Sequence, residues 1–144
     1  MSKDKKSIPA AVLKSIDDVA PTFDMPVTIQ VRGQEHIINL QCKALSKLEW
    51  AEIRDKSNEE ARARSEKRIE EASEEGGEKI KIANIVRDGM TADSALVMEF
   101  AIGWDFADPL SIESLIKLEN KCGGAIGSII GKYEVAIYQG RLGN

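Results

Sequence analysis

The chain has 144 residues, of which 42% are hydrophobic, and its 20 basic and 24 acidic residues give a net charge of −4. This length corresponds to one ordinary domain, and the negative charge excludes a generally basic surface for gripping nucleic acid. No apolar run approaches the roughly 20 residues that a membrane-spanning helix needs. The charged N-terminus is followed by no long apolar stretch, so we expect no secretory signal. Cys42 and Cys122 lack metal-ligand spacing, which predicts reduced cytosolic thiols and neither a metal nor a cofactor.

The predicted domain organisation has two parts. Residues 1–21 predict a flexible N-terminal arm with at most one or two helical turns, because no strong period runs through them. Residues 22–144 predict a single domain. Within it we expect a β-hairpin at 22–44, a helix with a charged arm at 45–79 and a helical core at 80–144.

The clearest local pattern is an alternation of apolar and polar residues over 25–31 and again over 38–42, which predicts two antiparallel strands. A lone hairpin is marginal in water, so its apolar face must pack on helices. Pro26 has no N–H to donate to a strand ladder, which predicts that the first strand has a free edge.

The turn between these strands sets the predicted register. If Gly33 and Gln34 form a two-residue type II′ turn, Arg32 faces Glu35 and both apolar faces align. The pairs expected on the apolar face are Met25 with Cys42, Val27 with Leu40, and Ile29 with Ile38.

A helix start follows the hairpin directly. Ser46 and Glu49 form a capping box, and Leu45 and Trp50 occupy the positions of a hydrophobic staple. We therefore interpret Trp50 as a packing residue, with a binding role as the alternative.

A highly charged segment then covers residues 52–79. Helix propensity is high there, but apolar residues are few, which predicts a solvated or partly frayed helical arm. Ser57 and Glu60 offer a second capping box at which the helix could restart, and Gly76 and Gly77 are expected to end it. A helix presented to a partner is the alternative.

The C-terminal half carries most of the core. We expect a short helix that ends near Gly89, a buried helix from Thr91 to Gly103, a helix N-capped by Ser111 and a last helix after Gly124. The predicted fold class is therefore α+β, mainly α, with an N-terminal β-hairpin followed by a small bundle of about four to five helices.

Three glycines share a four-residue spacing, namely Gly123, Gly127 and Gly131. We interpret this spacing as close helix–helix packing inside the domain, with self-association as the alternative.

Nothing in the sequence predicts an enzyme. His36 is the one histidine, and no nucleophile or zinc motif accompanies it. The basic residues of the charged segment alternate with glutamates, which favours solvated ion pairs over nucleic-acid binding. Those basic residues are Arg62, Arg64, Lys67 and Arg68.

The last third of the chain resembles the tail assembly chaperones of long-tailed bacteriophages and prophages. The resemblance rests on the order of its parts: an apolar helix leading to Gly103-Trp104-Asp105, a short acidic loop, a helix with spaced leucines, the small residues Gly124-Ala125, a last helix that carries Tyr133, and the terminal Arg141-Leu142-Gly143-Asn144. A β-hairpin before the helices is also similar to that family.

The resemblance implies a protein that binds the tape measure protein, helps to recruit tail tube (major tail) subunits in the host bacterial cytoplasm, and is absent from the mature virion. Self-association and a frameshift-extended form are further expectations. The alternatives are a structural minor tail or capsid-joining protein and a small regulatory nucleic-acid-binding module. The candidate protein-binding residues are Trp104, Asp105, Leu115, Ile130 and Tyr133. Of these, Trp104 and Tyr133 could equally be core anchors.

Overall fold

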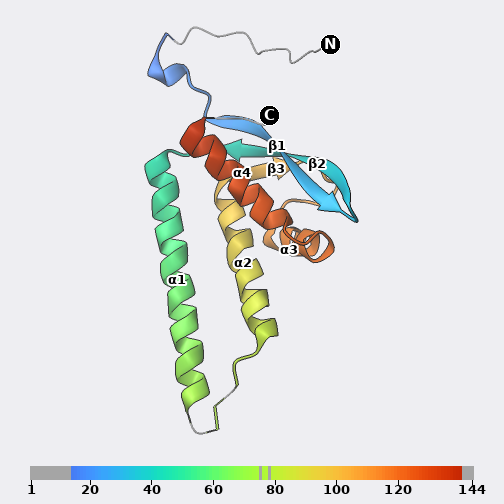
Figure 1. Ribbon diagram of the computed structural model, residues 1–144. Coiled ribbons are helices and arrows are strands. Elements are labelled where there is room, and N and C mark those ends of the chain that lie inside the picture. The colour runs from blue at the N-terminus through green and yellow to red at the C-terminus, as the bar shows by residue number, and fades with distance from the viewer. Residues whose placement is uncertain (1–13, 75, 78, 141–144) are drawn as a thin grey trace.

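The computed structural model describes residues 14–74, 76–77 and 79–140 (Figure 1). A single 3₁₀ turn, Ile16–Asp18, precedes the main elements. Those elements are β1 (Thr22–Val31), β2 (Gln34–Lys43), α1 (Lys47–Ser73), α2 (Ile82–Phe100), β3 (Ala101–Trp104), α3 (Ile112–Lys121) and α4 (Ala125–Gln139). The predicted fold class is confirmed: an antiparallel hairpin precedes the helices, and the described part of the chain is mainly helical.

Two of the segments discussed in the sequence analysis fall wholly or mostly outside these ranges. Most of the predicted N-terminal arm, residues 1–13, and the terminal residues 141–144 lie outside the described residues. Within the described part of the chain, none of the helices combines the length and the apolar character that a bilayer crossing requires.

The hairpin forms, but the predicted register is wrong. Val31 pairs with Gln34, so the turn consists of Arg32 and Gly33, whose φ angles are +51° and +79°. Two positive φ values are typical of a type I′ turn. Met25 consequently pairs with Leu40 rather than with Cys42.

The physical reason for this error lies in the two-residue periodicity of a strand. A slip of one residue exposes the apolar face, but a slip of two residues leaves the same side chains facing the core. The conformation of the turn therefore selects the register, and the apolar pattern alone cannot.

A third strand, β3, completes the sheet, whose strand order is β1-β2-β3. Ala101 lies opposite Cys42 and Trp104 lies opposite Leu40, with an irregularity between them. The predicted helical conformation up to Gly103 is therefore wrong, because α2 ends at Phe100 and the chain continues along the open edge of β2. β1 remains at the other edge, as Pro26 predicted.

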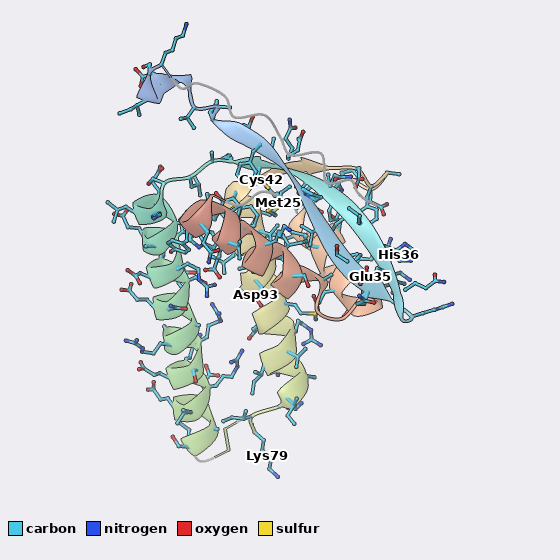
Figure 2. The ribbon with its side chains drawn as sticks, turned by 45° about the horizontal axis from the view of Figure 1, so that its top comes forward. Met25, Glu35, His36, Cys42, Lys79 and Asp93 are labelled. Carbon is cyan, nitrogen blue, oxygen red and sulfur yellow. The ribbon has the colours of Figure 1, made fainter. Side chains whose placement is uncertain are left out.

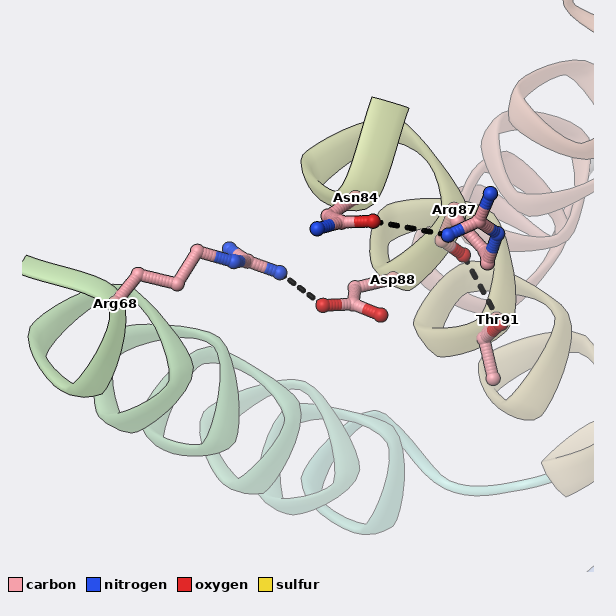
Figure 3. Close-up of polar contacts among 5 residues, drawn as sticks. All are labelled: Arg68, Asn84, Arg87, Asp88 and Thr91. Carbon is pink, nitrogen blue, oxygen red and sulfur yellow. Dashed lines mark hydrogen bonds and ion pairs between the residues drawn. The ribbon is translucent and has the colours of Figure 1, made fainter. Parts of the chain in front are cut away.

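Two predicted helix breaks do not occur. The capping box of Ser46 and Glu49 starts α1 as expected, but α1 continues without a restart through Ser57. α2 likewise continues through Gly89. Thr91 does not cap a new helix; its hydroxyl donates to the carbonyl of Arg87 at 3.0 Å, one turn back in the same helix (Figure 3). A glycine inside a helix costs only about 1 kcal/mol relative to alanine, which the rest of α2 offsets.

The core lies between the sheet and helices α2, α3 and α4 (Figure 1). At its centre Tyr133 stacks on Phe100, with ring centroids 3.8 Å apart, and Trp50 meets both rings edge-on. Trp50 is fully buried, which confirms its interpretation as a packing residue. Its indole N–H donates to the carboxylate of Glu134, so the buried polar group is satisfied.

The far parts of α1 and α2 project from this body as a helical hairpin, which we call the arm (residues 57–74 and 79–90; Figure 1). An ion pair between Arg68 and Asp88 joins the two helices of the arm (Figure 3). Most side chains on the arm are exposed, in agreement with the predicted solvated helix. Because α1 has 27 residues, it extends for about 40 Å.

Candidate functional site

The loop after β3 is fastened to β2 by Asp105. One oxygen of its carboxylate accepts a hydrogen bond from the backbone N–H of Asn39 at 3.1 Å, and the other accepts one from the Asn39 side-chain amide at 3.0 Å. The backbone N–H of Asp105 returns a bond to the carbonyl of Asn39. Asp105 thus joins its loop to the neighbouring strand β2.

These bonds hold the pKa of Asp105 below its usual range, because the Asn39 backbone N–H, and then its amide, favour the charged carboxylate. A lowered folded-state pKa contributes stability above the usual aspartate pKa of about 3.9. That contribution disappears as the pH falls through the folded-state pKa.

We therefore predict that Asp105→Asn is less stable than the wild type at neutral pH, and that the difference shrinks as the pH falls from about 4 downward. Urea unfolding over a pH series measures this difference. Asp108→Asn, in the same loop, is the matched control because its carboxylate makes no bond to Asn39. A difference that persists undiminished to the lowest pH would contradict the assigned role of Asp105.

Trp104 lies between the core and the surface. Its ring is half-buried, its indole N–H donates to the carbonyl of Asp108 at 2.6 Å, and Phe106 meets it edge-on at 4.9 Å. Trp104 thus holds the loop 104–108 in place and presents part of its ring to solvent. This position agrees with the interpretation of Trp104 as a core anchor, and its partner-facing role stays a prediction.

A groove of about 390 Å³ opens beside Trp104, between the turn end of the hairpin, the loop 104–108 and α3. We call it the hairpin groove. Most of its lining is apolar, and its apolar residues are Ile29, Val31, Ile37, Ile38, Trp104, Phe106, Leu118 and Cys122. Figure 2 shows His36, another lining residue, near the end of the hairpin that lies away from the arm.

The margin of the hairpin groove combines exposed apolar side chains with positive charge. Ile37 is 64% exposed and Phe106 is 39% exposed. Lys117 and Lys121 line the side formed by α3, and Asp108 is the acidic residue of the lining. Exposed apolar surface with a charged margin is typical of a protein-binding site.

The five predicted site residues do not converge on one surface. Trp104 lines the hairpin groove and Asp105 fixes the loop beside it. Leu115, Ile130 and Tyr133 lie in the core. These three side chains would therefore support a binding surface rather than touch a partner.

Tyr133 shows this role clearly. Its hydroxyl donates to the carbonyl of Lys43 at 2.7 Å and accepts from the N–H of Leu45 at 3.2 Å. Burial raises the pKa of Tyr133 to about 12. The hydroxyl thus satisfies the backbone that links β2 to α1, beside the entry of α1 into the body.

Sequence reasoning missed the residues that give the hairpin groove its apolar margin. Ile37 occupies an outward-facing position of the alternating strand, where a polar residue is usual, and Phe106 is an aromatic residue in an acidic loop. Both were detectable signals, because a large apolar side chain at an exposed position calls for an explanation when others lie beside it.

The predicted packing of the glycine stripe is wrong. Gly123, Gly127 and Gly131 are exposed, and a Cβ atom added to any of them would meet nothing within 4 Å. The close contact at this end of α4 comes instead from Glu119. Its carboxylate accepts hydrogen bonds from the N–H groups of Gly124 at 2.7 Å and Ile126 at 2.9 Å, and so caps the helix.

The described residues also hold no cluster of three or more side chains arranged to bind a metal ion. Burial raises the pKa of the Cys42 thiol to about 12, with a smaller effect of Asp24 in the same direction. A thiol in this state is a poor nucleophile.

An apolar groove with an exposed margin and a projecting helical arm are features common among proteins that bind other proteins. A family model described as phage tail assembly chaperone matches residues 1–144, the whole chain. The chain belongs to the phage tail assembly chaperone family. Neither the curated proteins nor the solved structures contain a match. Family membership assigns a role in tail assembly in the host, with tail proteins as partners, and indicates a non-enzymatic function.

Proposed function

We propose that this chaperone binds the tape measure protein in the host cytoplasm during tail assembly, keeps it soluble, and helps to recruit tail tube subunits. Family membership supports the general role. The observation that carries the proposal is the hairpin groove, which leaves Ile37 and Phe106 exposed beside an apolar lining. A long helical partner with apolar faces is the kind of chain that such a groove would protect from aggregation.

The mode of binding that fits the groove is an amphipathic helix laid into an apolar channel. Lys117 and Lys121 on one side favour acidic residues next to the apolar stripe of the partner. A groove of about 390 Å³ holds only a few side chains. Each contact can therefore be exchanged when tube subunits assemble on the tape measure protein and displace the chaperone.

Co-expression with the tape measure protein encoded in the same phage or prophage tests this proposal. The tape measure protein is expected to be insoluble alone and to co-elute with the wild-type chaperone in a defined ratio. The double variant Ile37→Asp/Phe106→Asp is expected to reduce the co-eluting tape measure protein by roughly tenfold or more, because two exposed apolar contacts are lost.

Ile102→Asp is the matched control, because Ile102 is an exposed isoleucine, 49% exposed, on β3 of the same sheet and does not line the groove. Co-elution should survive this change. If the wild type neither solubilises nor retains the tape measure protein, and instead remains in purified particles, the protein is a structural tail component. If co-elution survives the double variant, the partner binds elsewhere on the chaperone.

A further inference from the structure

Helices α1 and α2 leave a hollow between them that begins at the body and runs along the arm, and we call it the arm groove. Its part near the body measures about 640 Å³, and its part near the tip measures about 320 Å³. Arg64 and Asp88 line both parts, so the two are adjacent. This surface is separate from the hairpin groove and has no role in the function proposed above.

Charge is segregated along the arm groove. Apart from the shared Arg64 and Asp88, the charged residues that line the part near the body are Glu49, Glu52, Glu60, Glu99 and Lys56. Those that line the part near the tip are Lys67, Arg68, Lys79, Lys81 and Glu71. The first set has four acidic residues and one basic residue, and the second has the reverse. Figure 2 shows Lys79 at the end of the arm farthest from the sheet.

Apolar side chains line the part of the groove near the body, and others are exposed on the tip of the arm. Near the body the floor is formed by Ile53, by the small residues Ala92 and Ala95, and by Leu96. Near the tip several aliphatic side chains are strongly exposed although most of their neighbours are charged. These are Ile69, Ile80, Ile82, Ile85 and Val86, of which Ile80 lines the groove.

We propose that the arm is a homodimerisation element, in which two copies of this chain pack their arms antiparallel about a two-fold axis near the middle of the groove. The basic tip of each copy then lies on the acidic part of the other, and the exposed Ile80 of each tip contacts the partner's groove. A two-fold axis makes every contact twice, so a self-complementary surface is required. Apart from Arg64 and Asp88, the ratio of acidic to basic lining residues is 4:1 near the body and 1:4 near the tip, and this reversal meets the requirement.

A second copy fits these observations better than a different partner. An acidic helix would neutralise the tip but would meet like charges near the body, and a basic helix would do the opposite. Only a partner with the same charge gradient, running in the opposite direction, complements both ends. The resulting pairing of four antiparallel helices is a common and stable arrangement.

Charge reversal tests the proposal. One variant, Glu52→Lys/Glu60→Lys, makes the groove basic at both ends, and a second, Lys79→Glu/Lys81→Glu, makes it acidic at both ends. All four side chains are exposed, so both variants should fold. In light scattering after gel filtration the wild type should be a dimer, whereas each variant alone should dissociate at least about tenfold more readily because like charges meet twice.

The decisive result comes from mixing the two variants. In a mixed dimer the groove of one chain is basic and that of the other is acidic, so opposite charges meet at both ends. The equimolar mixture should therefore form a heterodimer at concentrations at which each variant alone is largely monomeric. The control is Glu59→Lys/Glu66→Lys, which makes the same change of charge on α1 at positions that do not line the groove. It should leave the dimer unchanged.

Three outcomes would overturn the proposal: a monomeric wild type, a dimer that neither reversal weakens, or a mixture that recovers nothing. A monomer whose reversals instead reduce co-elution with the tape measure protein would assign the arm groove to that partner. Because the assay uses this chain alone, its failure is distinguishable from failure of the proposed function.

Discussion

Tyr133→Ala is expected to lower the free energy of unfolding by about 3 to 5 kcal/mol, the usual cost of removing a buried aromatic side chain. Tyr133 is fully buried and stacks on Phe100, with Trp50 edge-on against both rings. The truncation would leave a cavity at the point where α1, α2 and α4 meet. Urea unfolding followed by circular dichroism measures the loss.

The variant Tyr133→Phe distinguishes the contribution of the ring to stability from that of the hydroxyl. This variant keeps the stacking but strands the carbonyl of Lys43 and the N–H of Leu45, and we expect it to cost about 1 to 3 kcal/mol. Tyr138→Phe is the matched control, because Tyr138 lies on the same helix and is 43% exposed. Equal effects of the two Tyr→Phe variants would show that the buried hydroxyl contributes nothing.

The second large effect is expected from Leu115→Ala, at about 2 to 5 kcal/mol. Leu115 is the fully buried residue of α3, and it follows the Ser111 cap by one turn. Ile112→Ala on the same helix is the control, since Ile112 is 37% exposed and its truncation should cost far less. The urea midpoints of the two variants give the comparison.

This variant also bears on binding, because α3 carries Lys117 and Leu118 of the hairpin groove. A loss of co-elution in Leu115→Ala would therefore reflect a displaced helix rather than a lost contact. A fully stable Leu115→Ala variant would contradict the burial on which this reasoning depends.

Features that depend on neighbouring residues were predictable from the sequence. The capping box at Ser46 and the N-cap at Ser111 are confirmed because each needs only a side chain and the N–H group three residues later. The alternation in the hairpin predicted which side chains face the core, since that choice depends on the strand itself.

Features that depend on distant residues were not predictable in this way. Nothing in Ala101–Trp104 itself requires a strand; the segment is extended because β2 offers it an open edge. Ser57 and Gly89 disfavour a helix only weakly, and α1 and α2 continue through them. The flanking sequence does not show how much stability the rest of each helix contributes. The register of the hairpin depended on the positive φ of Arg32, an uncommon conformation for a residue other than glycine.

For the same reason, only part of the candidate site could be predicted from the sequence. Trp104 and Asp105 were singled out by their motif, and Trp104 does line the hairpin groove. The groove itself is formed by residues from β1, β2, the loop after β3, and α3, so no single segment indicates it. Tyr133 and Leu115, predicted from the same resemblance, turn out to hold the body together.

The position of the arm in the chain has one further consequence. The arm leaves the body after β2 and returns at β3, two strands that are hydrogen-bonded to each other. The body thus fixes only the two ends of the segment that contains the arm. Whole helical turns could be added to or removed from both helices of the arm without disturbing the sheet. In an antiparallel dimer, the length of the arm would set the spacing between the two bodies. Related chaperones could therefore differ in that spacing while they keep the same body.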